Sequence, residues 1–146
     1  ANLYGVENWL SMLRAEDETP YKVAAPLCNM EELADVINTL KLLGFKIGVI
    51  SWLSKQSSKE YKKKVTKAKR EWLSNMFPVA FDEMHFVQYG TPKHRTAKVK
   101  YGILIDDDDG VREKWERYGG MTINPKEEDI VEELRQIALY AIEGII

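Results

Sequence analysis

The sequence predicts an α/β protein whose mostly parallel sheet is covered by helices on both faces, a three-layer Rossmann-like arrangement. Apolar runs of strand length alternate along the chain with segments whose apolar residues recur at helical spacing. The strand-like runs are apolar throughout, which is typical of parallel strands buried on both faces. The length of 146 residues corresponds to a single domain.

Composition excludes several classes of protein. The chain is 45% hydrophobic and 30% charged, as globular proteins are, and its formal net charge of -2 is unlike that of a basic nucleic-acid coat. The single Cys28 cannot form an intrachain disulfide and favours a reducing, cytoplasmic location. One cysteine and two histidines do not complete a structural zinc site. We find no apolar run long enough to span a membrane and no signal-peptide pattern.

The first part of the chain predicts a small cap or entry segment over residues 1–28, followed by the core over residues 29–146. Residues 4–13 have the pattern of one helix, and residues 15–26 form a polar, proline-containing loop. A cap this small leaves a site open to bulky substrates.

The core begins with a helix and a buried strand. Asn29 and Glu32 are spaced as in a capping box, and Gly44 is typical of a helix end. Residues 45–50 form an apolar run that predicts a strand ending at Ser51.

A second helix is predicted from Ser57 to Met76, with Glu60 at the capping-box position. Seven lysines and arginines lie between Lys59 and Arg70, and most are expected on a solvated outer face. The alternative is a track for an anionic polymer. The apolar positions of this helix are Tyr61, Val65, Ala68, Trp72 and Met76.

The remaining elements continue the alternation. Strands are predicted over residues 84–87, 101–105 and 121–124, with a helical turn opening at 91–92 and a helix over 111–118. Asn124, Pro125 and Glu127 predict the start of the last helix. Its inward-facing residues are expected to be Ile130, Leu134, Ile137 and Ala141.

Functional groups of parallel α/β sheets collect beyond the carboxyl ends of the strands. Here those positions are Ser51, residues 88–93 and residues 106–109. The Ser51 hydroxyl and the next backbone N–H groups, including that of Trp52, could hold a phosphate oxygen. The alternative is a loop serine that caps a turn.

The four consecutive aspartates 106–109 repel one another unless cations offset their charge. Clustered carboxylates suit Mg²⁺, which takes one or two of them together with water and substrate phosphate. Asp106 and Asp107 are the predicted ligands. The alternative is a solvated acidic loop that caps the helix beginning at Val111.

Lys93 precedes this acidic strand and could neutralise a phosphoryl group while holding the carboxylates together. Lys98 and Lys100 are alternatives for that role. His94 could face the site, whereas His85 and Cys28 are expected to be structural.

The order of Ser51 after one strand, Lys93, and then Ile105-Asp106-Asp107 at the end of another resembles the haloacid dehalogenase (HAD) phosphohydrolase superfamily. The resemblance extends over residues 29–133. It is strongest to the phage and bacterial 5′-nucleotidase-like and polynucleotide-3′-phosphatase-like branches. It implies a HAD-type core with a minimal cap.

The resemblance also implies roles for individual residues. Ser51, with the backbone at Trp52, would bind the transferring phosphoryl oxygen, and Lys93 would screen its charge. Asp106 and Asp107 would hold Mg²⁺. Catalysis of such phosphoryl transfer is mainly positioning and charge neutralisation.

The chain departs from the family pattern at the nucleophile. The family's Asp-x-Asp-Gly motif comes directly after a first strand, and no such strand precedes Ser51; the opening residues 1–5 resemble the segment immediately after that motif. Residues 107–111 repeat its spelling, but no phosphate-binding serine and lysine come after them. We therefore expect an N-terminally truncated, inactive chain that lacks a mid-sheet strand. The gap would be filled by residues outside the sequence, by the apolar tail 138–146, or by a second subunit in a homo-oligomer.

The expected function is that of a Mg²⁺-dependent phosphomonoester hydrolase acting on a phosphorylated small molecule or nucleotide. Two alternatives are a non-catalytic phosphate- or partner-binding module on the same scaffold and an end-processing protein of the polynucleotide 3′-phosphatase type. A membrane partner is not expected, and nucleic acid is a less favoured partner.

Overall fold

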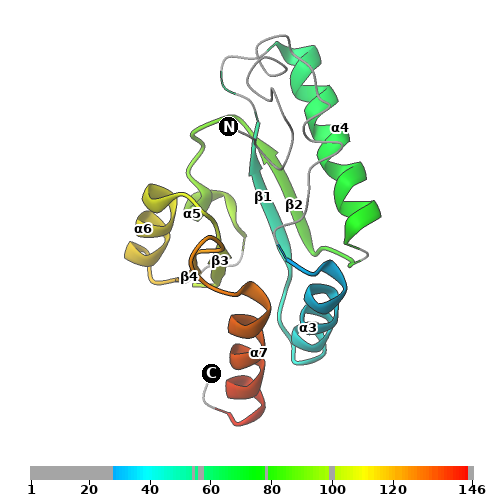
Figure 1. Ribbon diagram of the computed structural model, residues 1–146. Helices are drawn as coiled ribbons and strands as arrows, with labels where there is room; N and C mark the ends of the chain where they lie inside the picture. The colour runs from blue at the N-terminus through cyan, green and yellow to red at the C-terminus, as the bar shows by residue number, and fades with distance from the viewer. Residues whose placement is uncertain (1–27, 54, 56–57, 78, 99–100, 145–146) are drawn as a thin grey trace. The chain divides into compact units, whose positions relative to one another are not determined.

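The computed structural model describes residues 28–53, 55, 58–77, 79–98 and 101–144, which form five helices and four strands in mixed α/β order (Figure 1). The predicted α/β class is confirmed at this level. Residues 1–27 of the predicted cap segment and Lys100 lie outside the described residues. None of the described helices is long and apolar enough to cross a membrane.

The chain divides into two compact units. The first contains the described parts of 51–78 and 86–91. The second contains 28–50, 79–85 and the described parts of 92–146. Strands β1 (Gly48–Trp52) and β2 (Glu83–Val87) contribute residues to both units.

The four described strands form two separate pairs. β1 pairs with β2, and hydrogen bonds from Asp82 N to Ile47 O and from Leu53 N to Val87 O advance in the same direction along both strands, so the pair is parallel. β3 (Ile103–Ile105) is parallel to β4 (Met121–Ile123), with Ile103 opposite Met121. The described residues therefore form two short sheets in place of one continuous sheet.

β1 and β2 are joined at their starts by a reciprocal contact between Ile47 and Asp82. The Asp82 carboxylate accepts a hydrogen bond from Ile47 N at 2.7 Å, and Asp82 N donates to Ile47 O at 2.7 Å. The hydrogen bond from Ile47 lowers the pKa of Asp82. Desolvation of the carboxylate opposes this effect, and the charges of Lys41 and Lys46 lower the pKa further.

The first and last described helices, α3 (Met30–Leu42) and α7 (Ile130–Ile142), pack against each other. Asn29 caps α3 as predicted, accepting from Glu32 N at 3.1 Å. Asp129 caps α7 in the same way. The buried residues of the two helices are Ala34, Val36, Ile37, Leu40, Ile130, Val131, Leu134, Ile137 and Ala138.

The predicted start of the last helix at Asn124 is wrong. The Asn124 side chain accepts from Lys126 N at 3.1 Å, and its carbonyl accepts from Glu128 N at 2.9 Å, so these residues close a turn. Asparagine often closes such turns with its own side chain, and here Asp129 takes the helix cap five residues later.

Helix α4 (Lys59–Met76) covers the core of the first unit. Its N-cap is Ser58, whose hydroxyl accepts from Tyr61 N at 3.1 Å. The predicted Ser57 lies outside the described residues. Tyr61 and Val65 form a buried cluster with Leu53, and Phe86 packs against it. Of the remaining predicted apolar positions, Ala68 is buried, Trp72 is half-buried and Met76 is exposed.

Two boundaries around β3 differ from the prediction. Tyr101 has a φ of 63°, in the left-handed region, so the strand begins at Ile103 and not at residue 101. Helix α6 (Asp109–Arg117) begins before the predicted Val111 because Asp108 supplies its cap. The short α5 (Lys93–Thr96) begins directly after Pro92, as the predicted turn requires.

The Asp82 contact predicts a pH-dependent contribution to stability. Because its folded pKa lies below the unfolded value of about 3.9, the carboxylate stabilises the fold above that pH, and the contribution is lost as pH falls through the folded pKa. We expect Asp82→Asn to lower the free energy of unfolding at pH 6. At acid pH, the free energies of unfolding of the variant and the parent should differ less.

Urea denaturation from pH 6 to pH 2.5 checks this expectation, with Asp35→Asn as the control for an exposed carboxylate on α3. A constant difference between Asp82→Asn and the parent across this range contradicts it.

Candidate functional site

The centre of the candidate site is an ion pair between Lys93 and Asp106 in the second unit. The Lys93 ammonium donates to Asp106 Oδ2 at 2.5 Å, and the two side chains are only 12% and 8% exposed. Lys93 is placed by α5, and Asp106 comes directly after the last residue of β3. Two residues predicted to act together are thus in direct contact.

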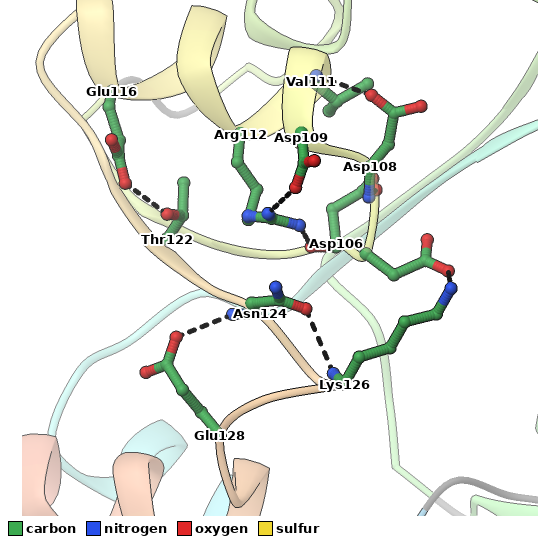
Figure 2. Close-up of polar contacts among 11 residues, drawn as sticks. Asp106, Asp108, Asp109, Val111, Arg112, Glu116, Thr122, Asn124, Lys126 and Glu128 are labelled. Carbon is green, nitrogen blue, oxygen red and sulfur yellow. Dashed lines mark hydrogen bonds and ion pairs between the residues drawn. The ribbon is translucent and has the colours of Figure 1, made fainter.

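Backbone contacts fix the Asp106 carboxylate further. Its Oδ1 accepts from Asp108 N at 2.9 Å, which closes a tight turn between β3 and α6. Arg112 reaches from α6 to the Asp106 carbonyl oxygen at 2.9 Å (Figure 2). Both carboxylate oxygens of Asp106 therefore have partners within the fold.

The other three aspartates of the run also have internal partners. Asp107 lies 3.5 Å from the Lys126 ammonium, and Asp109 pairs with Arg112. Asp108 caps α6, accepting from Val111 N at 2.9 Å. A carboxylate at a helix N-terminus is favoured by the helix dipole. The predicted repulsion is therefore offset residue by residue, and the alternative interpretation of the run as a helix-capping loop describes Asp108 and Asp109.

The two predicted Mg²⁺ ligands, Asp106 and Asp107, have different surroundings. Within the described residues, no group of three or more histidine, cysteine, aspartate or glutamate side chains is arranged to hold a metal ion. Asp107 is 55% exposed and directed to Lys126, whereas Asp106 is enclosed and paired with Lys93. Mg²⁺ binding at Asp106 and Asp107 stays a prediction.

Ser51 and Trp52 lie in the first unit, beside Lys69. The Lys69 ammonium donates to Ser51 Oγ at 2.7 Å and to the Trp52 carbonyl oxygen at 2.7 Å. Trp52 Nε1 donates to Thr91 O at 2.7 Å, which fixes the indole ring. Because Ser51 Oγ accepts from Lys69, its own proton can be donated to an anion. Ser51 belongs to the first unit and Lys93 to the second, so their predicted proximity stays a prediction.

Sequence reasoning missed Lys69, Arg112 and Lys126. Most of the cations between Lys59 and Arg70 are expected on the outer face, and Lys69 was not singled out from them, but it is partly buried. It lies four residues after the buried Val65, so its helical spacing already indicated the inner face. Arg112 lies three residues after Asp109, a spacing that brings side chains together on a helix. No sequence signal links Lys126 to Asp107.

The other residues considered in the sequence analysis make contacts within the fold. His94 stacks on Tyr118 with ring centroids 4.3 Å apart, and His85 contacts Glu83 at 3.2 Å. Lys98 is exposed, and its backbone N–H donates to Glu83. Burial raises the pKa of Cys28, and the charges of Asp129 and Glu32 raise it further, which disfavours the reactive thiolate.

Comparison of the chain with protein-family models, with curated proteins and with solved structures finds no match in any of the three.

The enclosed ion pair predicts a large difference between two neighbouring aspartates. Asp106→Asn removes the carboxylate that pairs with the enclosed Lys93 ammonium, so we expect it to lower the free energy of unfolding by about 3 kcal/mol. Asp107→Asn removes only an exposed contact with Lys126, and we expect a decrease below about 1 kcal/mol. Chemical denaturation of both variants measures the difference, and equal decreases contradict the assignment.

Proposed function

We propose that this protein is a phosphomonoester-binding domain of the HAD-like type, built as the scaffold of a 5′-nucleotidase-like hydrolase. The proposal includes a three-layer core with a minimal cap. The observation that carries it is the enclosed Lys93–Asp106 ion pair at the carboxyl end of β3. That edge of a parallel sheet is where α/β proteins bind ligands.

Lys93 is the proposed phosphate-binding group. The bond from the Lys93 ammonium to Asp106 Oδ2 fixes the position of the nitrogen. Asp106 thus acts as a positioning residue, since it holds the lysine in one place. A positioned ammonium stabilises a phosphoryl group more than a mobile one, because it does not lose side-chain freedom on binding.

Ser51 is the second proposed phosphate ligand. Its hydroxyl proton and the neighbouring Lys69 ammonium together provide donors of the kind that a phosphoryl oxygen accepts. The Trp52 carbonyl oxygen accepts a hydrogen bond from the Lys69 ammonium and so helps to fix its position. Lys69 therefore holds Ser51 in place within the first unit.

Binding of phosphate in this proposal does not depend on a metal ion. Mg²⁺ binding at Asp106 and Asp107 stays a separate prediction, tested by calorimetric titration of Mg²⁺ into the parent and into Asp107→Asn. Saturable binding that disappears in the variant supports the metal site, and identical heats in both proteins contradict it.

Binding of thymidine 5′-monophosphate, with thymidine as the control ligand, tests the function directly. We expect the nucleotide to bind and the nucleoside not to. Lys93→Gln should weaken binding at least about tenfold, since it removes a positioned charge. Lys98→Gln is the matched control, because Lys98 is an exposed lysine of the same segment.

Circular dichroism shows whether Lys93→Gln is folded, and Lys93→Arg retains the charge if it is not. Equal affinity of the parent, Lys93→Gln and Lys98→Gln contradicts the proposal. Turnover of p-nitrophenyl phosphate, with and without Mg²⁺, separates a hydrolase from a binding module. Nucleotide binding without turnover identifies the binding module.

A second candidate function is nucleic-acid binding by the basic face of α4. A shallow groove of about 450 Å³ lies over this face in the first unit. Leu53 forms its apolar floor, and Arg70 lies over the Phe86 ring at 4.8 Å. The charged residues that line it are Lys62, Lys63, Lys67, Arg70 and Glu71. Four cations against one carboxylate in a chain of net charge -2 favour a phosphodiester ligand.

This second function predicts salt-dependent binding of single-stranded oligothymidylate. Combined Lys62→Ala and Lys63→Ala changes should reduce the slope of log K against log salt by about 0.7 for each phosphate that is no longer neutralised. Lys114→Ala, on exposed α6, is the control. An unchanged slope in the double variant refutes a nucleic-acid role for this face.

A further inference from the structure

Two aromatic rings lie together at the carboxyl ends of β1 and β2, within the first unit. β1 ends at Trp52 and β2 at Val87, and Leu53 N donates to Val87 O at 2.8 Å, so the two strand ends are adjacent. The rings of Trp52 and Tyr89 have centroids 5.0 Å apart and are tilted by 54°, a favourable arrangement for an aromatic pair. The pair therefore lies at the edge of a parallel sheet where ligands bind.

The Trp52 ring is fixed by its own hydrogen bond. Its Nε1 donates to Thr91 O at 2.7 Å in a part-buried contact. The indole ring therefore gives Tyr89 a surface with a fixed position to pack against.

Tyr89 is placed by a tight turn. Thr91 N donates to Gln88 O at 3.0 Å, which closes a turn of four residues with Tyr89 and Gly90 at its centre. Gly90 has a φ of 87°, and the third position of such a turn requires this left-handed conformation. Tyr89 is nevertheless 51% exposed. A ring that is held in place and open to solvent loses little freedom when a ligand binds to it.

Two ammonium groups bring positive charge to the same strand ends. The Lys55 ammonium lies over the Tyr89 ring, 5.7 Å from its centroid, and Lys55 is exposed. The Lys69 ammonium donates to the hydroxyl of Ser51, the last residue but one of β1. An exposed aromatic ring beside cations matches a ligand that joins a flat ring system to a negative charge.

This surface is stable in contact with water, so the fold does not require that anything cover it. The Tyr89 ring carries a polar hydroxyl, and the ammonium of the exposed Lys55 is hydrated. A nucleotide has both of the parts that the surface matches, a base that can stack on the ring and a phosphate that can pair with the ammonium. An aliphatic phosphate ester has only the second part.

We propose that Tyr89, supported by Trp52 and flanked by Lys55, stacks on the base of a nucleotide, either a free mononucleotide or one nucleotide of a single strand. Bases stack in this way on aromatic side chains that lie beside positive charge. Lys55 pairs with the phosphate of the bound nucleotide. The inference rests on the proposed function in that both require a phosphorylated ligand, and it adds the base as the part that distinguishes a nucleotide from other phosphomonoesters.

Pairs of ligands with and without a base test the proposal on the full chain. Thymidine 5′-monophosphate is compared with 2-deoxyribose 5-phosphate, and hexathymidylate is compared with a hexamer of abasic sites. We expect the member with bases to bind at least about tenfold more tightly in one pair or in both. The NMR signals of the Tyr89 ring and of Trp52 Nε1–H should shift with that member and not with its partner.

Variants separate the ring from the charge. Tyr89→Leu should remove the preference for the base, whereas Tyr89→Phe retains the ring and should keep it. Tyr140→Leu changes an exposed tyrosine on α7 and is the control for the ring. Lys55→Gln should weaken binding of both members of a pair, and Lys114→Gln, on exposed α6, is its control.

The two pairs also identify the source of the nucleotide. A preference within the first pair assigns the site to a free mononucleotide. A preference within the hexamer pair alone assigns it to a single strand. Either result supports the stacking role of Tyr89.

Three results overturn the proposal. They are equal binding within both pairs, no binding of any of the four ligands, and a preference for the base that survives in Tyr89→Leu. Lys93→Gln distinguishes this failure from that of the proposed function. If this variant binds both phosphate esters equally and more weakly than the parent, the Lys93 site stands without the stacking site. If the preference depends on Tyr89 while Lys93→Gln binds as the parent does, the stacking site stands without Lys93.

Discussion

Four adjacent carboxylates at the end of β3 are held together because each has its own partner. Lys93 pairs with Asp106, Lys126 with Asp107 and Arg112 with Asp109, while Asp108 caps α6. These contacts fix the turn between β3 and α6, and the Lys93–Asp106 pair joins α5 to that turn. It also leaves Lys93 held in one position at the carboxyl end of a strand, and the proposed phosphate site depends on that fixed ammonium.

The local structure was predictable wherever one residue decides it. Asn29 as a helix cap, Pro92 before a helical turn and the apolar run into Asp106 all act over a few residues, and the structure has them as expected. The pairing of Lys93 with Asp106 was predictable for a similar reason, since a run of carboxylates requires cations and Lys93 precedes the same strand. The start of α7 was not predictable in this way, because Asn124 and Asp129 are both good caps and only their side-chain contacts decide between them.

Longer-range features were beyond the sequence pattern. The spacing of Lys69 from the buried Val65 indicates the inner face of α4. Its contact with Ser51, however, depends on how α4 lies over its own unit. The separation of the strands into two pairs also had to be observed, since apolar runs show that strands are buried but not which strands are neighbours.

The central claim is that Lys93, positioned by Asp106, binds a phosphoryl group. The most direct measurement is the NMR signal of the Lys93 side-chain ammonium during titration with thymidine 5′-monophosphate. The account predicts a saturable shift of this signal in the parent protein and a much weaker response in Asp106→Asn. A Lys93 signal that stays constant while the nucleotide binds elsewhere on the protein would contradict it.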